Sequence, residues 1–244
     1  MEIPHFRYGS VSSTNDVARE LLRDLPAVFV SAQYQERGRG RHGRPWIGDH
    51  GANIYCSLGL RHLQPLSAQA IPGLIALGAI ATWETIIALT DSPTLFLLKF
   101  PNDMLGRCPD GSWRKLAGIL VEHIAIPNGP ASIIGIGINI CQTKFPSPLA
   151  ARSTSLSLLG FNLAPEDVLF PLKQNLEALL SLSSAELFHR WRSLLQIEGR
   201  LLTLQGHPGL WRAIALRDDG GLEVEQHGIR IVLTNGDSVQ YVFQ

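Results

Sequence analysis

The chain has 244 residues, a length that fits one large domain or a large domain followed by a small one. Lysine and arginine together number 21, and aspartate and glutamate also number 21, so the formal net charge is zero. Proteins that coat DNA or RNA usually carry a basic excess, so this balance argues against a general nucleic-acid binder. Hydrophobic residues make up 45% of the chain and charged residues 17%, which is typical of a soluble globular protein.

Cysteine usage and the apolar segments bear on the cellular compartment. Cys56, Cys108 and Cys141 are widely spaced and odd in number, which indicates neither a disulfide framework nor a zinc site. The N-terminus lacks the basic and apolar regions of a signal peptide. The most apolar segment, over 71–83, contains Pro72 and is shorter than the roughly 20 residues that cross a bilayer. We therefore expect a cytoplasmic protein that contacts no membrane, with this segment in a buried helix.

Hydrophobic periodicity predicts the elements of the first half of the chain. Ser13 and Asp16 have the spacing of a capping box, and the apolar stripe that follows predicts a helix that ends at Pro26. Alternation of apolar residues over 53–61 predicts a half-buried strand. The other elements expected here are a strand over 27–34, a loop that extends to residue 52, a long buried helix over 66–89 and a strand over 95–100.

The second half of the chain changes character near residue 198. Before this point, two strands are predicted to form a hairpin, and two helices follow them. After it, short β-rich runs alternate with turns that contain glycine, which indicates a small all-β module. The hairpin strands cover 115–126 and 131–140, the helices 167–182 and 185–196, and the short runs 201–205, 211–216, 222–225, 229–233 and 238–243, with turns that include His207-Pro208-Gly209 and Asn235-Gly236. The expected domains are therefore 1–197 and 198–244.

The loop after the strand over 27–34 is rich in glycine and arginine. It reads Gly38-Arg39-Gly40-Arg41-His42-Gly43-Arg44-Pro45-Trp46. Glycines let a backbone approach a ligand closely, and guanidinium groups suit phosphate or carboxylate, although a solvated basic turn is the alternative. The run fits the dinucleotide pattern G-x-G-x-x-G, but no helical period follows it, so no helix N-terminus meets a pyrophosphate. A P-loop is absent too, so we expect side-chain guanidinium groups to hold the anion.

Three further segments combine polar residues with strand ends or interior glycines. Lys99-Phe100-Pro101-Asn102-Asp103 follows a strand and suits either a site or a simple turn. Lys115-Leu116-Ala117-Gly118-Ile119-Leu120 places an interior glycine where a ligand approaches closely or where neighbouring residues pack. Gly135-Ile136-Gly137-Ile138-Asn139-Ile140 contains a buried asparagine, which needs a backbone or a ligand partner. The residues alone therefore indicate an α/β protein that binds a small anionic ligand, one that contains a nucleotide.

Taken together, these segments resemble those of biotin protein ligases. The resemblance covers nearly the whole chain, and the markers follow the order that the family shows. They are Ser13-Thr14-Asn15, Gln35, the loop over 38–46, Gly51-Ala52-Asn53-Ile54-Tyr55, and the three segments that contain Lys99, Lys115 and Asn139. The resemblance implies an α+β fold: a mixed β-sheet packed with helices, similar to class II synthetases, with a small C-terminal SH3-like β-barrel.

The resemblance also implies an activity and its substrates. Such ligases activate biotin by attack of its carboxylate on the α-phosphate of ATP, with Mg²⁺, and then transfer biotin from biotinyl-5′-AMP to a lysine of a biotin carboxyl carrier protein, a subunit of acetyl-CoA carboxylase. Lys115 matches the lysine at the biotin carboxylate, and Arg41 joins it as a catalytic residue because cationic groups stabilise charge on the phosphate. Asp103 is expected to assist with Mg²⁺ or to orient the acceptor lysine.

The family's motifs assign the binding residues as follows. The residues expected at biotin are Ser13, Thr14, Asn15, Gln35, Gly38, Arg39, Gly40, Arg41, Lys115 and Gly118. Those expected at ATP or the adenylate are Arg39, Arg41, Arg44, Trp46, Asn102, Lys115 and Asn139. The glycines indicate a loop that is disordered when empty and that closes over the adenylate to exclude water.

Some features depart from the family pattern or leave alternatives open. His42 stands where many relatives carry arginine, Pro45 stiffens the exit of the loop, and Phe100 replaces a tryptophan. Few residues precede Ser13, so we expect no DNA-binding domain, no repressor function and no DNA partner; a homodimer is possible. The alternatives are a lipoate or octanoyl ligase or transferase, and a nucleic-acid-binding protein.

Overall fold

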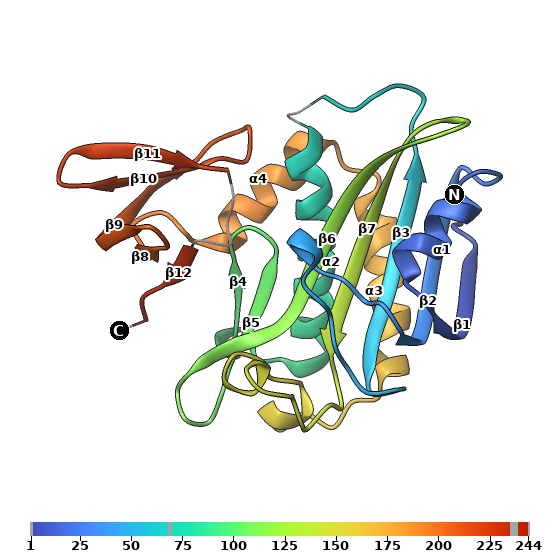
Figure 1. Ribbon diagram of the computed structural model, residues 1–244, viewed down its shortest axis with the longest axis horizontal. Helices are drawn as coiled ribbons and strands as arrows, with labels where there is room; N and C mark the ends of the chain where they lie inside the picture. Colours follow the sequence, from blue (N-terminus) through green and yellow to red (C-terminus); the bar gives the residue numbers. More distant parts are fainter. Residues whose placement is uncertain (1, 68–69, 235–238, 244) are drawn as a thin grey trace.

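The computed structural model describes residues 2–67, 70–234 and 239–243 (Figure 1). A mixed seven-stranded sheet with the order β1-β2-β3-β7-β6-β5-β4 forms its body, and a second, five-stranded sheet follows at the C-terminal end. The body contains β1 (His5–Val11), α1 (Thr14–Leu21), β2 (Ala27–Gln35), β3 (Asn53–Arg61), α2 (Ile71–Thr90), β4 (Phe96–Lys99), β5 (Asp103–Arg107), β6 (Trp113–Ile126), β7 (Gly129–Asn139), α3 (Pro165–Leu179) and α4 (Ser184–Leu195). Short 3₁₀ turns cover Arg41–Gly43, Pro93–Leu95, Leu149–Ala151 and Ser157–Leu159.

The large sheet is mixed because its first pair is parallel. β1 runs parallel to β2, and each of the other neighbouring pairs is antiparallel. The sequence does not predict β1 or β5. β1 is an edge strand that carries Arg7 and Gly9 and has no clean apolar alternation, so its sequence gives no strand pattern. The α+β class with a mixed sheet is confirmed.

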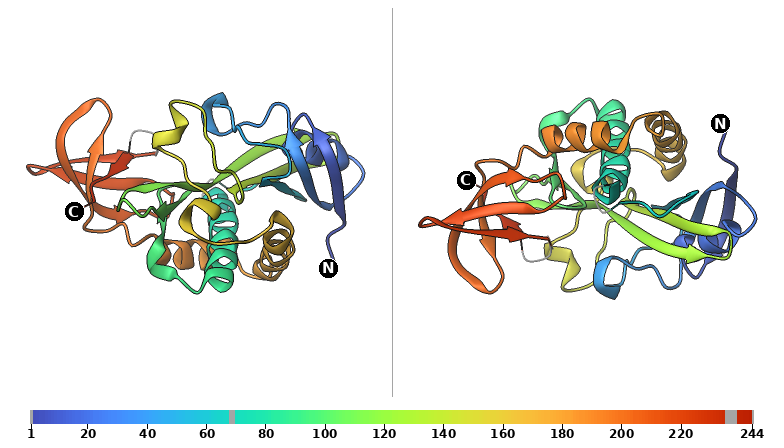
Figure 2. Two further views of the ribbon diagram at one scale, coloured as in Figure 1. Left: turned by 90° about the horizontal axis from the view of Figure 1, so that it is seen from below. Right: turned by 90° about the horizontal axis from the view of Figure 1, so that it is seen from above.

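Helices cover the two faces of the sheet unequally. Helices α2, α3 and α4 lie on one face, and the segment 36–52 and the turn at Leu149–Ala151 lie on the other (Figure 2). Helix α1 packs on β2, β3 and β7, where Leu22 and Ile133 belong to a small core of their own. Strand β3 is therefore buried on both faces over 53–59, and the prediction that it is half-buried is wrong.

Helix α2 is the central helix of the larger core. The helix spans 20 residues and is long and apolar enough to cross a membrane. The expectation from residues 71–83 alone, that the segment is too short, is wrong by length. The helix is nevertheless packed inside the protein, against α3, α4 and the sheet. Its residue Gly78 lies so close to the sheet that a Cβ there would approach Ile119 to 2.9 Å and Ile134 to 3.0 Å. The prediction of a buried helix is thus confirmed, although α2 begins at Ile71 and the expected start at 66 differs; residues 68–69 lie outside the described residues.

The predicted capping box of α1 is wrong. Ser13 occupies the N-cap position, but its side chain accepts no capping hydrogen bond. The carboxylate of Asp16, expected to reach back to Ser13, instead forms an ion pair with Arg39 at 2.8 Å. A longer-range charge interaction thus replaces the local one.

The C-terminal sheet follows from the predicted short runs. It contains β8 (Leu201–Leu204), β9 (His207–Leu216), β10 (Leu222–Gln226), β11 (Ile229–Leu233) and β12 (Val239–Tyr241), in the order β11-β10-β9-β8-β12. Among the described residues β11 and β12 do not pair, so the expected barrel stays open. The expected turn at 207–209 is part of β9, and the expected turn at Asn235-Gly236 and residue 238 lie outside the described residues.

The C-terminal sheet packs against the body next to β4 and α4. Its buried side chains, such as Leu202 and Val224, belong to the same apolar core as α2 and α4. Phe243 stacks on Trp113 with ring centroids 5.5 Å apart. The phenol oxygen of Tyr241 accepts a hydrogen bond from the backbone N–H of Phe100 at 2.9 Å. The second sheet therefore contacts the segment that leads into β5.

Candidate functional site

The predicted site residues gather on the face of the sheet that is opposite α2, α3 and α4. The start of α1, the loop over 36–52 and the loop-facing sides of β3, β6 and β7 meet there (Figure 2). Strand order explains this gathering, because β3, β7 and β6 are neighbours although they are far apart in the sequence. The site consists of a polar end near α1 and a charged end near Lys115.

The polar end is a buried hydrogen-bond network around Thr14 and Asn15. The backbone N–H and the hydroxyl of Thr14 both donate to Gln35 Oε1, at 2.8 and 3.0 Å. Ser57 Oγ lies 2.7 Å from Thr14 Oγ1 and 2.6 Å from Asn15 Oδ1. Because Gln35 Oε1 accepts these hydrogen bonds, its amide nitrogen is the group left to donate elsewhere.

At this polar end the sequence did not identify Ser57, and it singled out the segment of Gly135 without its contact to Asn15. Ser57 is fully buried in β3, where a polar residue inside an apolar strand was the available indication. Gly135 on β7 lies beneath Asn15, and a Cβ at this position would come within 2.4 Å of Asn15 Oδ1. The glycine therefore makes room for the asparagine. Ser13 is also buried at this end.

Arg39 joins the polar end to the loop through two carboxylates. Its guanidinium group forms a bidentate pair with Asp16, at 3.0 and 2.8 Å, and also donates to Glu122, at 3.0 Å for the closest contact. Glu122 in turn accepts a hydrogen bond of 2.6 Å from Asn15 Nδ2. Hydrogen bonding to Asp16, and secondly to Glu122, raises the pKa of Arg39 above its ordinary value. The sequence did not identify Asp16 or Glu122 as partners of this arginine.

The glycine- and arginine-rich loop folds back on itself. The N–H of Gly40 donates to the carbonyl of Arg44 at 2.7 Å, and the N–H of Trp46 donates to the carbonyl of Gly38 at 2.9 Å. A 3₁₀ turn over 41–43 reverses the chain, with His42 at a φ of 55°. No helix follows Gly43 within the described residues up to β3, which agrees with the exclusion of a dinucleotide site.

The charged end is formed by Lys115 and Asp103 on neighbouring strands. Lys115 Nζ lies 2.6 Å from Asp103 Oδ1 and 5.3 Å from the centroid of the Trp46 ring. The backbone of Lys115 is fixed on its other side, because its N–H donates to the carbonyl of Arg152 and its carbonyl accepts from the N–H of Thr154. A partly buried ammonium group with one carboxylate and an aromatic face is suited to neutralise an incoming anion.

Arg41 and Asn102 reach the same end of the site. Arg41 Nη1 donates to Asn102 Oδ1 at 3.2 Å, and Asn102 Nδ2 donates to the carbonyl of Ile119 at 2.7 Å. The tip of the loop thereby contacts the segment that links β4 to β5. Lys99, from that same segment, is half-buried and ends β4.

The indole of Trp46 lies directly on two glycines. Gly118 on β6 and Gly137 on β7 face each other across the strands. A Cβ at Gly137 would approach the indole to 2.6 Å, and a Cβ at Gly118 would approach it to 3.0 Å and Lys115 to 2.9 Å. Trp46 Nε1 is buried and has no hydrogen-bond partner among the described residues. The two glycines thus form the flat surface on which Trp46 and Lys115 pack.

Two further predicted residues are Asn139 and Arg44. Asn139 is buried at the end of β7, and its Nδ2 donates to the carbonyl of Thr154 at 2.9 Å, so a backbone partner satisfies its amide. Arg44 is exposed at the exit of the 3₁₀ turn. The described residues contain no group of three or more His, Cys, Asp or Glu side chains that could hold a metal.

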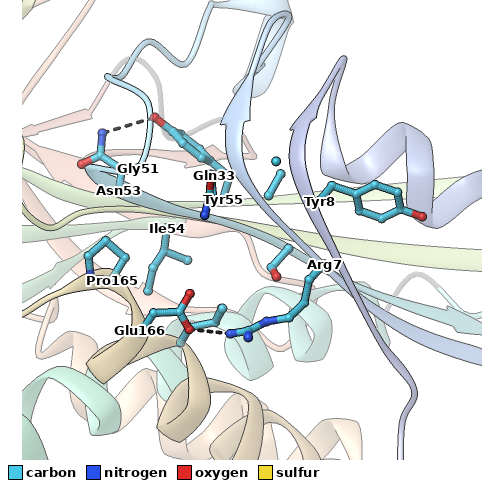
Figure 3. A pocket seen from close by; sticks show the side chains of 13 residues that line it. Arg7, Tyr8, Gln33, Gly51, Asn53, Ile54, Tyr55, Pro165 and Glu166 are labelled. Atoms are coloured by element: carbon cyan, nitrogen blue, oxygen red, sulfur yellow. Dashed lines mark hydrogen bonds and ion pairs between the residues drawn. The ribbon is translucent and has the colours of Figure 1, made fainter.

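The structure also contains a cavity of about 410 Å³ on the other face of the sheet (Figure 3). It lies between β1, β2, β3 and the start of α3, where Arg7 forms an ion pair with Glu166. None of the predicted site residues lines it. Gly51, Asn53, Ile54 and Tyr55, which belong to one of the family's markers, do line it. The residues expected at biotin and ATP therefore lie apart from this cavity, although one sequence motif reaches it.

Comparisons with known proteins identify the family of the chain. Residues 9–139 match the model of the biotin/lipoate A/B protein ligase family. The chain is 35% identical over 138 residues to biotin–[acetyl-CoA-carboxylase] ligase of Mycobacterium tuberculosis, covering 56% of this chain and 47% of that protein. It is 32% identical over 191 residues to bifunctional ligase/repressor BirA of Escherichia coli, covering 75% of this chain and 57% of that protein. The chain thus spans about half the length of these relatives.

A solved structure shares the fold over nearly the whole chain. It is the biotin protein ligase from Aquifex aeolicus in complex with biotin and ATP, with a TM-score of 0.73 and 22% identity over 99% of each chain. At this identity the likeness concerns the fold alone. The family match, in contrast, covers the segments that supply the loop, Lys115 and Asn139.

Proposed function

Because the chain belongs to the biotin/lipoate A/B protein ligase family, we propose that it is an ATP-dependent biotin protein ligase. It forms biotinyl-5′-AMP from biotin and ATP and transfers biotin to a lysine of a biotin carboxyl carrier protein. The observation that carries this proposal is that a buried polar network around Thr14 and a cationic end at Lys115 lie on one face of the sheet. The names of the relatives, biotin–[acetyl-CoA-carboxylase] ligase among them, support it.

Lys115 receives the carboxylate of biotin. Biotin and ATP are both anions, and a cation between them offsets their repulsion and stabilises the charge on the α-phosphate as the new bond forms. The ion pair of 2.6 Å with Asp103 holds the ammonium group of Lys115. Backbone hydrogen bonds to Arg152 and Thr154 fix the main chain of Lys115. Arg41, held by Asn102, lies at the same end and is the second cation of the adenylation step.

The network at the start of α1 receives the ring system of biotin. The ureido group carries both donors and a carbonyl acceptor, so a buried site must offer partners of both kinds. Gln35 offers its amide nitrogen, and the hydroxyls of Thr14 and Ser57 with Asn15 offer the rest. Ser13, Gly38 and Gly40 complete this end through backbone or side-chain contacts, and Gly118 gives space beside Lys115.

ATP lies beside the loop, with Arg44 on its phosphates and Trp46 against its adenine. Asn139 lies at the end of β7 and supports the nucleotide site indirectly, because its side-chain amide donates to the carbonyl of Thr154. Mg²⁺ would be held by the phosphates of ATP together with a carboxylate, and Asp103 is the residue that would supply it. Alternatively, Asp103 would orient the ammonium group of the acceptor lysine, as it pairs with Lys115 in the structure.

The acceptor and the compartment follow from the same proposal. A carboxyl carrier domain presents its lysine to the adenylate at the charged end, and residues 198–244 form a C-terminal domain next to the catalytic domain over 1–197. The reaction takes place in the cytoplasm, where the three free cysteines stay reduced. A homodimer remains a prediction from the resemblance.

The test is biotin-dependent exchange of pyrophosphate into ATP, followed by transfer of biotin to a carrier domain. We expect Lys115→Ala to lower kcat/KM by about 100-fold or more, as loss of one electrostatic stabiliser does in other active sites. Lys144→Ala, which removes an exposed lysine, is the matched control and should keep full activity. Exchange that depends on lipoate and not on biotin would identify a lipoate ligase, and salt-sensitive RNA binding without exchange would identify a nucleic-acid-binding protein.

A further inference from the structure

The guanidinium group of Arg39 is held by two carboxylates from outside the loop. Five hydrogen bonds join its guanidinium group to Asp16 and Glu122, at distances between 2.8 and 3.2 Å. Its side chain is 26% exposed, and those of Asp16 and Glu122 are 42% and 23% exposed.

The two carboxylates come from different parts of the body. Asp16 lies in the first turn of α1, and Glu122 lies on β6. Arg39 sits near the beginning of the loop, before the turn over 41–43. The guanidinium group therefore ties one end of the loop to α1 and β6 at once, and we call these three residues the Arg39 anchor.

Glu122 has a second role within the same network. Its carboxylate accepts from Asn15 Nδ2 at 2.6 Å, and Ser57 approaches Asn15 Oδ1 at 2.6 Å. An ionised carboxylate only accepts hydrogen bonds, so it forces the amide nitrogen of Asn15 toward itself and the amide oxygen toward Ser57. One carboxylate thus sets both the position of the loop and the orientation of Asn15.

We propose that Asp16 and Glu122 are positioning residues that act through Arg39 and Asn15, and that Arg39 serves as the fixed end of the loop and not as a phosphate ligand. Each of the three guanidinium nitrogens already donates to a carboxylate, so an anion that bound Arg39 would compete with Asp16 and Glu122. The loop then moves about this fixed end, and its tip with Arg41 carries the contacts to the reacting anions. The effect on catalysis rests on the proposed function; the fixation of the loop does not.

Trypsin cleavage tests the fixation without any substrate. The loop offers cleavage sites after Arg37, Arg39 and Arg41, which are protected as long as the loop is fixed. We expect Asp16→Asn and Glu122→Gln to speed cleavage in the loop by about tenfold, because a local opening that costs 1.4 kcal/mol less is populated about tenfold more. Asp24→Asn, at the exposed C-terminal side of α1, is the control and should cleave like the wild type.

Exchange kinetics test the consequence for the reaction. If the anchor positions the site, Asp16→Asn raises both the KM for biotin and the rate of adenylate release severalfold, while kcat changes less than twofold. Glu122→Gln has the larger effect, because it also frees the side chain of Asn15. Arg39→Ala in the Asp16→Asn background then adds little, since the two residues act as a unit. Thermal unfolding of every variant separates these effects from a loss of folding.

Two results would overturn the proposal. One is a loop that trypsin cleaves at the wild-type rate in both carboxylate variants. The other is a loss of exchange in Arg39→Ala while Asp16→Asn and Glu122→Gln keep wild-type KM values, which would make Arg39 a direct ligand. A wild-type protein without biotin-dependent exchange would refute the proposed function, and the trypsin experiment would still decide whether the anchor exists.

Discussion

Tyr241 offers a precise test of how the C-terminal sheet supports the site. Its phenol oxygen accepts the 2.9 Å hydrogen bond from the N–H of Phe100, three residues before Asp103. Tyr241 is 8% exposed and Phe100 only 1% exposed, and burial raises the pKa of the Tyr241 hydroxyl above its ordinary value. The substitution Tyr241→Phe removes this acceptor and keeps the ring that packs beside Phe243.

The expected cost follows from the buried N–H that is left without a partner. An unsatisfied buried donor costs about 1–3 kcal/mol, so we expect the free energy of unfolding to fall by about 2 kcal/mol. Water cannot easily replace the phenol, because the Phe100 ring is buried against Trp191 with ring centroids 6.4 Å apart. Phe100 lies in the segment that leads to Asp103. The same change should therefore lower kcat/KM for biotin-dependent pyrophosphate exchange several-fold, because a shift of this segment misplaces the Asp103 carboxylate.

Urea unfolding and pyrophosphate exchange measure the two effects. Tyr8→Phe is the matched control, because Tyr8 lies on the distant edge strand β1, and it should change the unfolding free energy by less than about 0.5 kcal/mol. Tyr241→Phe with the same stability as the wild type would mean that the hydrogen bond contributes nothing. Lower stability with unchanged exchange would mean that the C-terminal sheet supports the fold and not the site.

Two further predictions concern the glycine surface and pH. Gly137→Ala should displace the indole of Trp46, because the new Cβ would lie 2.6 Å from it; we expect a changed tryptophan fluorescence and faster adenylate release, whereas Gly9→Ala, with nothing within 4 Å, should alter neither. Burial lowers the pKa of His5 and His62 below 6.5. Below this pH the unfolded chain binds more protons at these histidines than the folded protein does, so the free energy of unfolding should fall as pH decreases from 6.5. Urea titrations at pH 7.5 and 5.5 check this, and a His62→Gln variant with an undiminished pH slope would contradict it.

Strong periodicity made most of the fold predictable. Strands β2 and β3 and the β6–β7 hairpin follow directly from apolar patterns and a turn that contains glycine. Strands β1 and β5 were missed because pairing with a neighbour, and not their own pattern, makes them strands: β1 lies at the sheet edge beside β2, and β5 lies between β4 and β6. Local sequence does not contain that information.

The candidate site was predictable in its segments and not in its pairings. The loop, Lys115 and Asp103 were identified, but the carboxylates that hold Arg39 were not. Arg39 and Glu122 are 83 residues apart, and only the order β3-β7-β6 brings their strands and the loop together. The expected capping box at Asp16 failed for the same reason, since the ion pair with Arg39 is a tertiary contact that competes with the local one.

The interior glycines of β6 and β7 show how the fold and the site depend on each other. The sequence predicted that Gly118 marks either a close approach of a ligand or simple packing, and it noted Gly135 and Gly137 in the next strand. In the structure they accommodate side chains of the chain itself: Gly135 lies under Asn15, while Gly118 and Gly137 pair across the strands beneath Trp46 and Lys115. A methyl group at any of them would first displace one of these side chains. An effect of alanine at these positions on biotin binding must therefore pass through Asn15, Trp46 or Lys115.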